Sequence, residues 1–433
     1  MSPVHIRLWG QTVGAITLDP SSPAAFFEYD ADFMDSGLNV SPLMMPLADG
    51  VYNFPDLGRI NAFEGLPGLV SDSLPDKFGK QIINRWLSDQ GREPNTATPI
   101  ERLCYTGTRA MGALEYFPAL GPSPEEGSQL EVARLVHLAN EVLSDRSGLD
   151  TSLDDSKGFH DILLVGTSAG GARAKAVVAW NPATNEVRSG QVDTAAGFQH
   201  WLIKFDGITG NRDKELADPQ GYGCIEYAYH LMAREAGITM SDCRLMEENG
   251  RHHFMTRRFD RLPDGQKLHM QSLGAMAHLD FNDAGAHSYE EALLVARRLD
   301  LSAADREQLT RRALFNIVAR NQDDHVKNIA FLMDKQGTWS LSPAYDVVYS
   351  YNPTGAWTGQ HQMSLHGKRD HFTRADLKTF DQFALLPRGR ALRILDEIIS
   401  VVRRWPDFAE TAGVGEESMR KIRKAHRLDF PAS

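Results

Sequence analysis

The hydrophobic pattern of this chain changes its period near residue 285, and this change restricts the folds that the chain can adopt. Residues 162–165, 176–180 and 201–205 are short β-rich apolar runs separated by glycine-rich or Asn-Pro turns. Beyond residue 285, apolar residues recur at helical spacing, as at Leu309 and Ala313. A sheet followed by helices is typical of a two-lobed α+β domain and argues against a repeated βαβ fold.

The opening region carries its own sheet and helix signals. Residues 4–18 alternate apolar runs with turn residues, which predicts a small antiparallel sheet. Residues 73–76 (Ser-Leu-Pro-Asp) lead into residues 77–87, whose apolar side chains share one helical face. A Pro/Gly-rich bridge at 121–127 and a polar stretch at 144–158 predict a boundary near residue 150. We therefore expect an N-terminal α+β subdomain over residues 1–150, a first lobe over 151–262 and a mainly helical C-terminal lobe over 263–433.

Charge and cysteine content limit the function classes. The chain has 46 Lys and Arg against 57 Asp and Glu, a net charge of −11, so direct nucleic-acid binding needs a basic patch or a basic partner. Cys104, Cys224 and Cys243 form no CxxC motif, which disfavours a zinc site or a disulfide framework and fits a reducing compartment. Without a signal-peptide pattern or a membrane-length apolar run, we expect a cytoplasmic protein with no membrane partner.

The polar segment 320–328 is the strongest indication of chemistry in the sequence. It reads Arg-Asn-Gln-Asp-Asp-His-Val-Lys-Asn and lies between a helical pattern and the apolar run 329–333. Asp323 and Asn328 have the D-x-x-x-x-N spacing of phosphotransfer catalytic loops, in which Asp deprotonates the acceptor hydroxyl and Asn holds Mg²⁺. A plain surface loop is the alternative, but the composition and the context favour an active centre.

A second acidic residue, Asp346, follows this segment by one predicted hairpin. The apolar run 329–333, a turn at 334–337 and a short run at 339–341 return the chain to its starting point. Asp346 is therefore expected beside Asn328, where a metal ion carried by nucleotide phosphates needs hard oxygen ligands. An isolated Asp after a strand is otherwise a cap or turn residue.

Lys204 stands in the apolar strand pattern of residues 201–205. A lysine there is either an edge residue in water or a buried cation with an anionic partner. Kinases place such a lysine on the nucleotide phosphates and often pair it with a helix glutamate, for which Glu226 is a candidate.

A glycine-rich segment, residues 166–175, precedes that strand. Three glycines in six residues let backbone N–H groups approach an anion, and Arg173 and Lys175 add positive charge. The segment also spells G-x-S-x-G around Ser168, the nucleophile elbow of α/β hydrolases, but that motif needs a helix directly after the turn. Here a β-rich run follows, so a serine hydrolase is the weaker alternative.

The order of these motifs resembles the HipA family of serine/threonine kinase toxins. The resemblance covers nearly the whole chain, including the opening sheet and the Ser-Leu-Pro-Asp segment at 73–76. Its most specific element is N-x-D-D-H-x-K-N at residues 321–328; Thr-Arg-Arg-Phe-Asp-Arg at 256–261 and Pro-Ala-Tyr-Asp at 343–346 also match. The resemblance implies a two-lobed protein-kinase-like fold with an N-terminal subdomain packed on it.

The resemblance also implies roles for individual residues. Asp323 would be the catalytic base, Asn328 and Asp346 the Mg²⁺ ligands, and Ser168 the autophosphorylated serine whose modification inactivates the enzyme. The segment 257–259 would line the adenine site. The implied nucleotide-binding residues are Ser168, Ala169, Gly170, Lys175, Lys204, Arg257, Arg258, Phe259, His325, Lys327, Asn328 and Asp346.

The implied activity is that of an ATP- and Mg²⁺-dependent protein serine/threonine kinase, the toxin of a type II toxin–antitoxin system. Its implied partners are a dimeric helix-turn-helix antitoxin of the HipB type, operator DNA reached mainly through that antitoxin, and an aminoacyl-tRNA synthetase substrate of the glutamyl type. A serine hydrolase using Ser168 and a catalytically silent co-repressor remain as alternatives.

Overall fold

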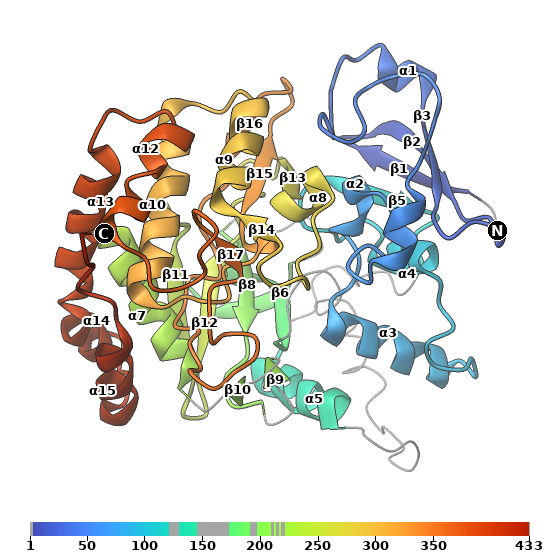
Figure 1. Cartoon of the computed structure of the whole chain (residues 1–433). Coiled ribbons are helices and arrows are strands. Elements are labelled where there is room, and N and C mark those ends of the chain that lie inside the picture. Colours follow the sequence, from blue (N-terminus) through green and yellow to red (C-terminus); the bar gives the residue numbers. More distant parts are fainter. Residues whose placement is uncertain are drawn as a thin grey trace.

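The computed structural model describes residues 3–120, 130–144, 173–190, 197–208, 212–213, 216–217 and 221–432. Figure 1 shows an N-terminal sheet on one side of the molecule and a largely helical C-terminal part on the other, with the two chain ends on opposite sides. Within the described ranges no helix is both long and apolar enough to cross a bilayer. The glycine-rich loop with Ser168, Ala169 and Gly170, and the predicted boundary near residue 150, lie outside these residues.

The N-terminal sheet is antiparallel and has the strand order β4-β3-β2-β1-β5. In β1, Val4, Ile6 and Leu8 are buried while His5 and Arg7 face outward, as the period of two predicts. The predicted opening hairpin is thus confirmed. The strands are β1 Val4–Leu8, β2 Gln11–Thr17, β3 Phe26–Tyr29, β4 Val51–Asn53 and β5 Leu114–Phe117; the helices around them are α1 Ala31–Met34, η1 Pro55–Arg59, α2 Gly68–Ser71 and α4 Pro99–Thr106.

A second antiparallel sheet, in the order β11-β12-β8-β6-β7, forms the middle of the chain. The runs predicted at 176–180 and 201–205 are its β6 and β8, and their register places Lys175 opposite Lys204. Helix α7 covers β11 and β12. The bounds are β6 Lys175–Asn181, β7 Glu186–Ser189, β8 Gln199–Lys204, β11 Cys243–Glu248, β12 Arg251–Arg257 and α7 Tyr222–Glu235, with a separate pair β9 Arg212–Asp213 and β10 Leu216–Ala217.

Helix α3, Lys77–Asp89, connects the opening region to this second sheet. Asp76 caps it by accepting a hydrogen bond from the Gly79 N–H at 2.7 Å. Its buried face, which includes Phe78 and Ile82, shares one hydrophobic core with α5 (Val132–Ser144) and the apolar side chains of β6 and β8. The predicted helix is confirmed, and its packing places Asp76 at the edge of the second sheet.

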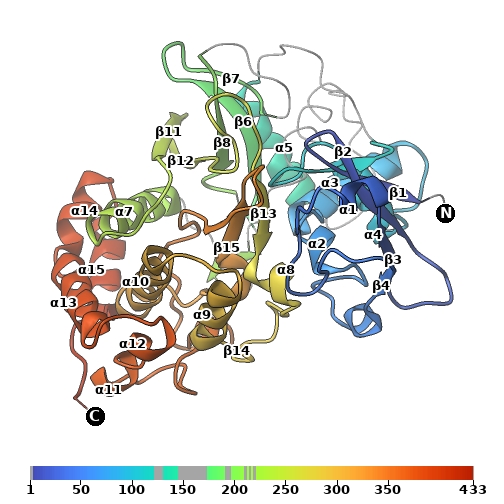
Figure 2. The ribbon, with the colours of Figure 1, turned by 90° about the horizontal axis from the view of Figure 1, so that it is seen from above.

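The C-terminal part has one large hydrophobic core, and Figure 2 shows α10, α13, α14 and α15 on the side of the molecule away from the N-terminal sheet, whereas α8 lies beside α2. The predicted Ser302–Asp305 capping box begins α10, and the predicted hairpin is the pair β15–β16. The elements are β13 His269–Ser272, α8 Leu273–Ala277, β14 His287–Ser288, α9 Tyr289–Arg298, α10 Ala303–Ala319, η2 Val326–Asn328, β15 Ala330–Met333, β16 Trp339–Leu341, β17 Met363–Ser364, α11 Arg374–Leu377, α12 Phe380–Phe383, α13 Arg390–Val402, α14 Trp405–Thr411 and α15 Glu416–Ala425.

A buried ionic cluster fastens the N-terminal region to the segment after β12. Asp260, fully buried, accepts from the Arg258 guanidinium at 2.6 and 2.9 Å and from Arg261 at 2.8 Å. It also accepts from the Gly112 backbone N–H at 2.7 Å. Burial opposes ionisation, but the two arginines outweigh it and hold the pKa of Asp260 well below its usual range.

We expect Asp260→Asn to lower the free energy of unfolding by about 3–5 kcal/mol, because it leaves two buried guanidinium groups without their anion. Asp242→Asn is the control: its long, exposed ion pairs to Arg234 and Arg257 are worth at most about 1 kcal/mol. Denaturant unfolding measures both. Because the folded pKa of Asp260 is depressed, its contribution is full above its ordinary pKa of 3.8 and shrinks as the pH falls below that value. Equal losses for the two variants would contradict this role.

Candidate active site

The polar segment 320–328 forms a loop that hydrogen bonds hold against residues 346–350. Helix α10 ends at Arg320, which has a left-handed backbone (φ +59°) and turns the chain out of the helix. The Gln322 N–H donates to the Ser350 carbonyl at 3.0 Å, and the Ser350 N–H donates to the Arg320 carbonyl at 3.1 Å. The loop then enters η2 and β15. The predicted proximity of this loop and the Asp346 segment therefore exists in the fold.

Asp323 presents a partly exposed carboxylate that is fixed on one side. Its Oδ1 accepts a hydrogen bond from the Trp357 indole Nε1 at 2.6 Å, and its Oδ2 lies 4.0 Å from the His325 Nε2. The Asn328 side-chain amide donates to the Asp323 carbonyl at 2.8 Å, which links the two ends of the D-x-x-x-x-N spacing. The side chain of Asp323 is 23% exposed, so an incoming hydroxyl can reach it.

The neighbouring Asp324 points into the protein. It accepts hydrogen bonds from the Tyr289 hydroxyl at 2.5 Å, from His361 Nδ1 at 2.8 Å and from the Gln362 N–H at 2.8 Å. Burial raises the pKa of Asp324, but His361 and these hydrogen bonds outweigh it, so the net pKa lies below the usual value. The two adjacent aspartates thus differ in kind: Asp324 anchors the loop, and Asp323 faces the open side.

Lys204 lies between two carboxylates from distant parts of the chain. Its Nζ is 2.5 Å from the Glu226 Oε1, on α7, and pairs with the Asp346 Oδ1. Burial disfavours the charged form of Lys204, but Asp346 and Glu226 outweigh burial and raise its pKa. Burial likewise disfavours the charged form of Asp346, and Lys204 with Lys175 overcomes it and lowers the pKa of Asp346. The candidate pairing of Glu226 with Lys204 is therefore present.

Asp346 has an unusual backbone as well as a buried partner. Its φ of +52° lies in the left-handed region, which non-glycine residues rarely adopt. The Asn321 side-chain amide donates to its carbonyl at 3.4 Å, and the preceding Tyr345 hydroxyl donates to the Lys327 carbonyl at 2.5 Å. These bonds hold Asp346 beside the loop that carries Asn328.

The N-terminal region reaches the same site. Asp72 accepts from the Ser272 N–H at 2.6 Å and hydroxyl at 2.9 Å, and lies 4.0 Å from the Lys327 Nζ. Lys175 is buried at the start of β6, where burial lowers its pKa although Asp76 and Asp346 act in the opposite direction. Sequence reasoning offered no signal for Asp72 or Asp76, because their place depends on how α3 packs.

The three residues predicted to line an adenine site, 257–259, lie in three different environments. Arg257 is about one-third exposed and lies 3.8 Å from Asp242, whereas the Arg258 guanidinium is bound to Asp260. The ring centroid of Phe259 is 5.7 Å from that of Tyr345, next to Asp346. Any contact of Arg258 with a nucleotide would therefore use its backbone.

The donor set decides which metal the site fits. In the part of the chain that the structure describes, no group of three or more His, Cys, Asp or Glu side chains could hold a metal ion by itself. Asp346 supplies an ionised carboxylate. The hydrogen bond from Asn328 to Asp323 uses the amide nitrogen, so the Asn328 Oδ1 is not occupied by that bond. One or two hard oxygens fit Mg²⁺ delivered with nucleotide phosphates.

Comparison with known proteins connects this geometry to described families. Residues 4–117 match the HipA N-terminal domain and residues 167–405 the HipA-like C-terminal domain. A Sinorhizobium fredii protein named Y4mE and described as a candidate kinase is 28% identical over 367 residues, which are 79% of this chain and 76% of that protein. A similarly described Haemophilus influenzae protein is 27% identical over 136 residues, 28% of this chain and 40% of that one.

The fold has a counterpart among solved structures. The chain superposes on HipA of Shewanella oneidensis, solved with HipB and its operator DNA, with a TM-score of 0.65 and 16% identity, covering 97% of this chain and 94% of that one. This confirms the predicted α+β, two-lobed, kinase-like fold.

We expect Lys204→Met to lower the free energy of unfolding by about 3 kcal/mol, because Glu226 and Asp346 lose their shared cation. Adding Glu226→Gln should recover part of this loss, since the neutral amide needs no counter-ion. Lys378→Met, at an exposed position, should be nearly neutral. Denaturant unfolding of the two single variants and the double variant tests the coupling, and strictly additive losses would argue against it.

Proposed function

This chain belongs to the HipA family, and from that membership we propose that it is an ATP- and Mg²⁺-dependent protein serine/threonine kinase acting as a type II toxin. The observation that carries the proposal is the convergence of Lys204, Glu226 and Asp346 beside a loop that presents Asp323. Lys204 and Asp346 are 142 positions apart in the sequence, yet their side chains form an ion pair. A buried lysine held by a helix glutamate is how kinases contact nucleotide phosphates.

Asp323 is the proposed catalytic base. Its carboxylate, which the Trp357 indole positions and which is 23% exposed, is proposed to accept the proton of a Ser or Thr hydroxyl. The acceptor oxygen then forms a bond to the γ-phosphorus while the bond from that phosphorus to the β,γ-bridging oxygen breaks, and ADP leaves. Asp324 contributes by holding the loop in place, through Tyr289 and His361.

Asp346 and Asn328 are the proposed Mg²⁺ ligands, and the bound ion would offset charge on the nucleotide phosphates. The raised pKa of Lys204 keeps it protonated at neutral pH, so it would contact the nucleotide phosphates as a cation. Lys175, His325 and Lys327 supply further donors near the phosphates. Arg257, Arg258 and Phe259 are proposed to border the adenine.

Ser168, Ala169 and Gly170 are proposed to cover the phosphates, and Ser168 to be autophosphorylated. A phosphoryl group adds about −1.5 to −2 charges, which would make the loop unable to hold another phosphate. These three residues lie outside the described ranges. What supports their role is the family membership and the position of β6, which begins at Lys175 directly after them.

The proposed partners are a HipB-type helix-turn-helix antitoxin dimer and, through it, operator DNA. The Shewanella oneidensis counterpart was solved with HipB and operator DNA, and the net charge of −11 suits a chain that reaches DNA through a basic partner. The proposed substrate is an aminoacyl-tRNA synthetase of the glutamyl type, on the strength of family membership alone.

The serine hydrolase alternative predicts a helix directly after G-x-S-x-G. The chain instead enters strand β6 at Lys175, which favours the kinase. A fluorophosphonate probe that labels Ser168 in a chain that fails to bind ATP would reverse this preference.

We expect Asp323→Asn to abolish phosphoryl transfer while ATP binding is retained, because the amide cannot take the acceptor proton. Intact-mass spectrometry after incubation with MgATP should show a phosphorylated species, mapping to Ser168, in the wild type only. Asp300→Asn, at an exposed turn in the same lobe, is the control and should behave as the wild type. Unchanged phosphorylation of Ser168 or of a protein target in Asp323→Asn would refute the kinase assignment.

We expect Asp346→Asn to remove most of the advantage that Mg²⁺ gives to ATP binding, because the ionised carboxylate is the charged metal ligand. The ratio of ATP affinities with and without Mg²⁺ should fall roughly tenfold or more. Isothermal titration calorimetry of both variants with ATP, with and without Mg²⁺, measures this ratio. Asp334→Asn, in the β15–β16 turn, should preserve it; a preserved ratio in Asp346→Asn would exclude Asp346 as a ligand.

A further inference from the structure

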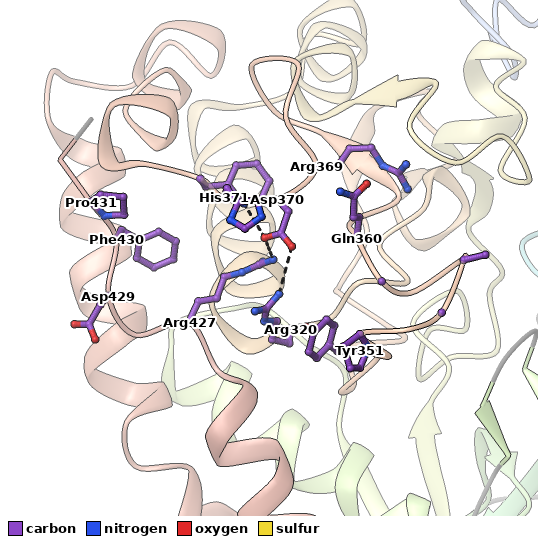
Figure 3. Close-up of a pocket in the computed structure, with 15 residues that line it drawn as sticks. Arg320, Tyr351, Gln360, Arg369, Asp370, His371, Arg427, Asp429, Phe430 and Pro431 are labelled. Atoms are coloured by element: carbon purple, nitrogen blue, oxygen red, sulfur yellow. Dashed lines mark hydrogen bonds and ion pairs between the residues drawn. The ribbon is translucent and has the colours of Figure 1, made fainter.

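A cavity of about 680 Å³ opens next to Arg320, the residue at which helix α10 ends and the polar segment 320–328 begins. Its walls come from residues 351–360, residues 369–372 and the C-terminal residues 427–431. Figure 3 shows Phe430 and Pro431 on one side and Arg369 and Gln360 on the opposite side, with Arg427 and Arg320 between them. None of these residues has a role in the proposed phosphoryl transfer. The volume is within the range of small-molecule sites.

The cavity carries an excess of positive charge. The guanidinium groups of Arg320, Arg369 and Arg427 face only two carboxylates, Asp370 and Asp429. Asp370 is shared: it pairs with Arg427 and lies 3.8 Å from Arg320. Burial disfavours ionisation of Asp370, but Arg427 outweighs it and lowers the pKa of the carboxyl, so the pair is charged at neutral pH.

Arg369 offers the open donors. Its Nε donates to the His361 carbonyl at 2.6 Å, and its two terminal nitrogens donate to no atom of the residues that the structure describes. The two terminal N–H groups of a guanidinium form a planar fork that matches the oxygens of phosphate or carboxylate. Tyr351, Phe372 and Phe430 also line the cavity, with Phe430 on the side opposite Arg369.

Two connections lead from this cavity to the catalytic loop. The Arg427 Nη1 lies 2.7 Å from the His361 Nε2, and because arginine can only donate, the Nε2 atom must accept. The Nδ1 atom of the same ring donates to the Asp324 carboxylate at 2.8 Å. In addition, the wall residues Gly355, Ala356 and Gly359 flank Trp357, whose indole holds Asp323.

We infer that this cavity binds the phosphate group of a small phosphate monoester, and that its occupancy acts on Asp323 through Trp357. A phosphate group brings about −1.5 to −2 charges and three acceptor oxygens, which suit the open donors of Arg369. A carboxylate brings one charge and two oxygens. The binding site stands independently of kinase activity, whereas its effect on catalysis rests on the proposed function. Trp357 is a positioning residue in this scheme, since it acts through Asp323.

The test is fluorine NMR of the full chain labelled with 5-fluorotryptophan, during titration with inorganic phosphate at constant ionic strength kept with chloride. The chain has seven tryptophans, and the signal lost in Trp357→Phe identifies the Trp357 resonance. We expect phosphate to shift this resonance saturably, and Arg369→Gln to weaken the apparent affinity roughly tenfold or more. Arg388→Gln, at an exposed position away from the cavity, should leave it unchanged. Absence of a saturable shift, or equal affinity in Arg369→Gln, overturns the inference.

Two further arms complete the test. Arg369→Lys keeps the charge but loses the fork, so it should weaken binding to an intermediate degree, and it replaces Arg369→Gln if that variant does not fold.

Phenyl phosphate should bind several-fold more tightly than inorganic phosphate because its ring can lie against the aromatic walls; equal affinity would contradict an organic ester as the ligand. Asp323→Asn should still bind phosphate, so a failed kinase assay and a failed binding site give different results.

Discussion

The ion pairs of Lys204, whose side chain is 10% exposed, are the constraint on which the rest of the site depends. The lysine is on β8, Glu226 is on α7, and Asp346 follows the β15–β16 hairpin, so three separately folded elements must meet at one ammonium group. A buried charge without a partner costs several kcal/mol, which makes any other relative placement of these elements unfavourable. The same requirement fixes the sheet that carries Lys175 and the loop that carries Asn328. The geometry of the proposed nucleotide site around Lys204 is thus determined by electrostatics as well as by packing.

The different roles of Asp323 and Asp324 follow from their surroundings. Asp324 accepts three hydrogen bonds from buried donors, which hold its carboxylate inside the protein. Asp323 has one oxygen tied to Trp357 and a partly exposed side chain. Two identical residue types at adjacent positions acquire a structural and a proposed chemical role because successive side chains of an extended segment point in opposite directions.

Whether a residue's contacts could be predicted from the sequence depends on whether its partner lies nearby in the chain. The strand around Lys204 and the hairpin before Asp346 follow from apolar patterning and turn residues, so both elements were predictable, whereas the ion pair between Lys204 and Asp346 was not. Glu226 remained a candidate because nothing local fixes which helix faces a strand. Trp357 and His361 could not be assigned: their partners are 34 and 37 positions away, and no periodicity encodes such a contact. His361 is a buried hydrogen-bond donor to Asp324.

The charge balance of the cleft explains why the proposed nucleotide should require a metal ion. Around Lys204, the cations Arg173, Lys175 and Lys204 lie among the carboxylates of Glu226, Asp346 and Asp76, and Lys327 and Asp72 add one charge of each sign. Burial raises the pKa of Asp76, and the nearby Lys175 partly offsets this effect. The N-terminal region thus adds a carboxyl group to the cleft, and Lys175 favours its charged form. A nucleotide triphosphate would bring several negative charges into a cleft that is already near neutrality. The compensating charge would then arrive with the nucleotide as a metal ion, for which Asp346 and Asn328 are the proposed ligands.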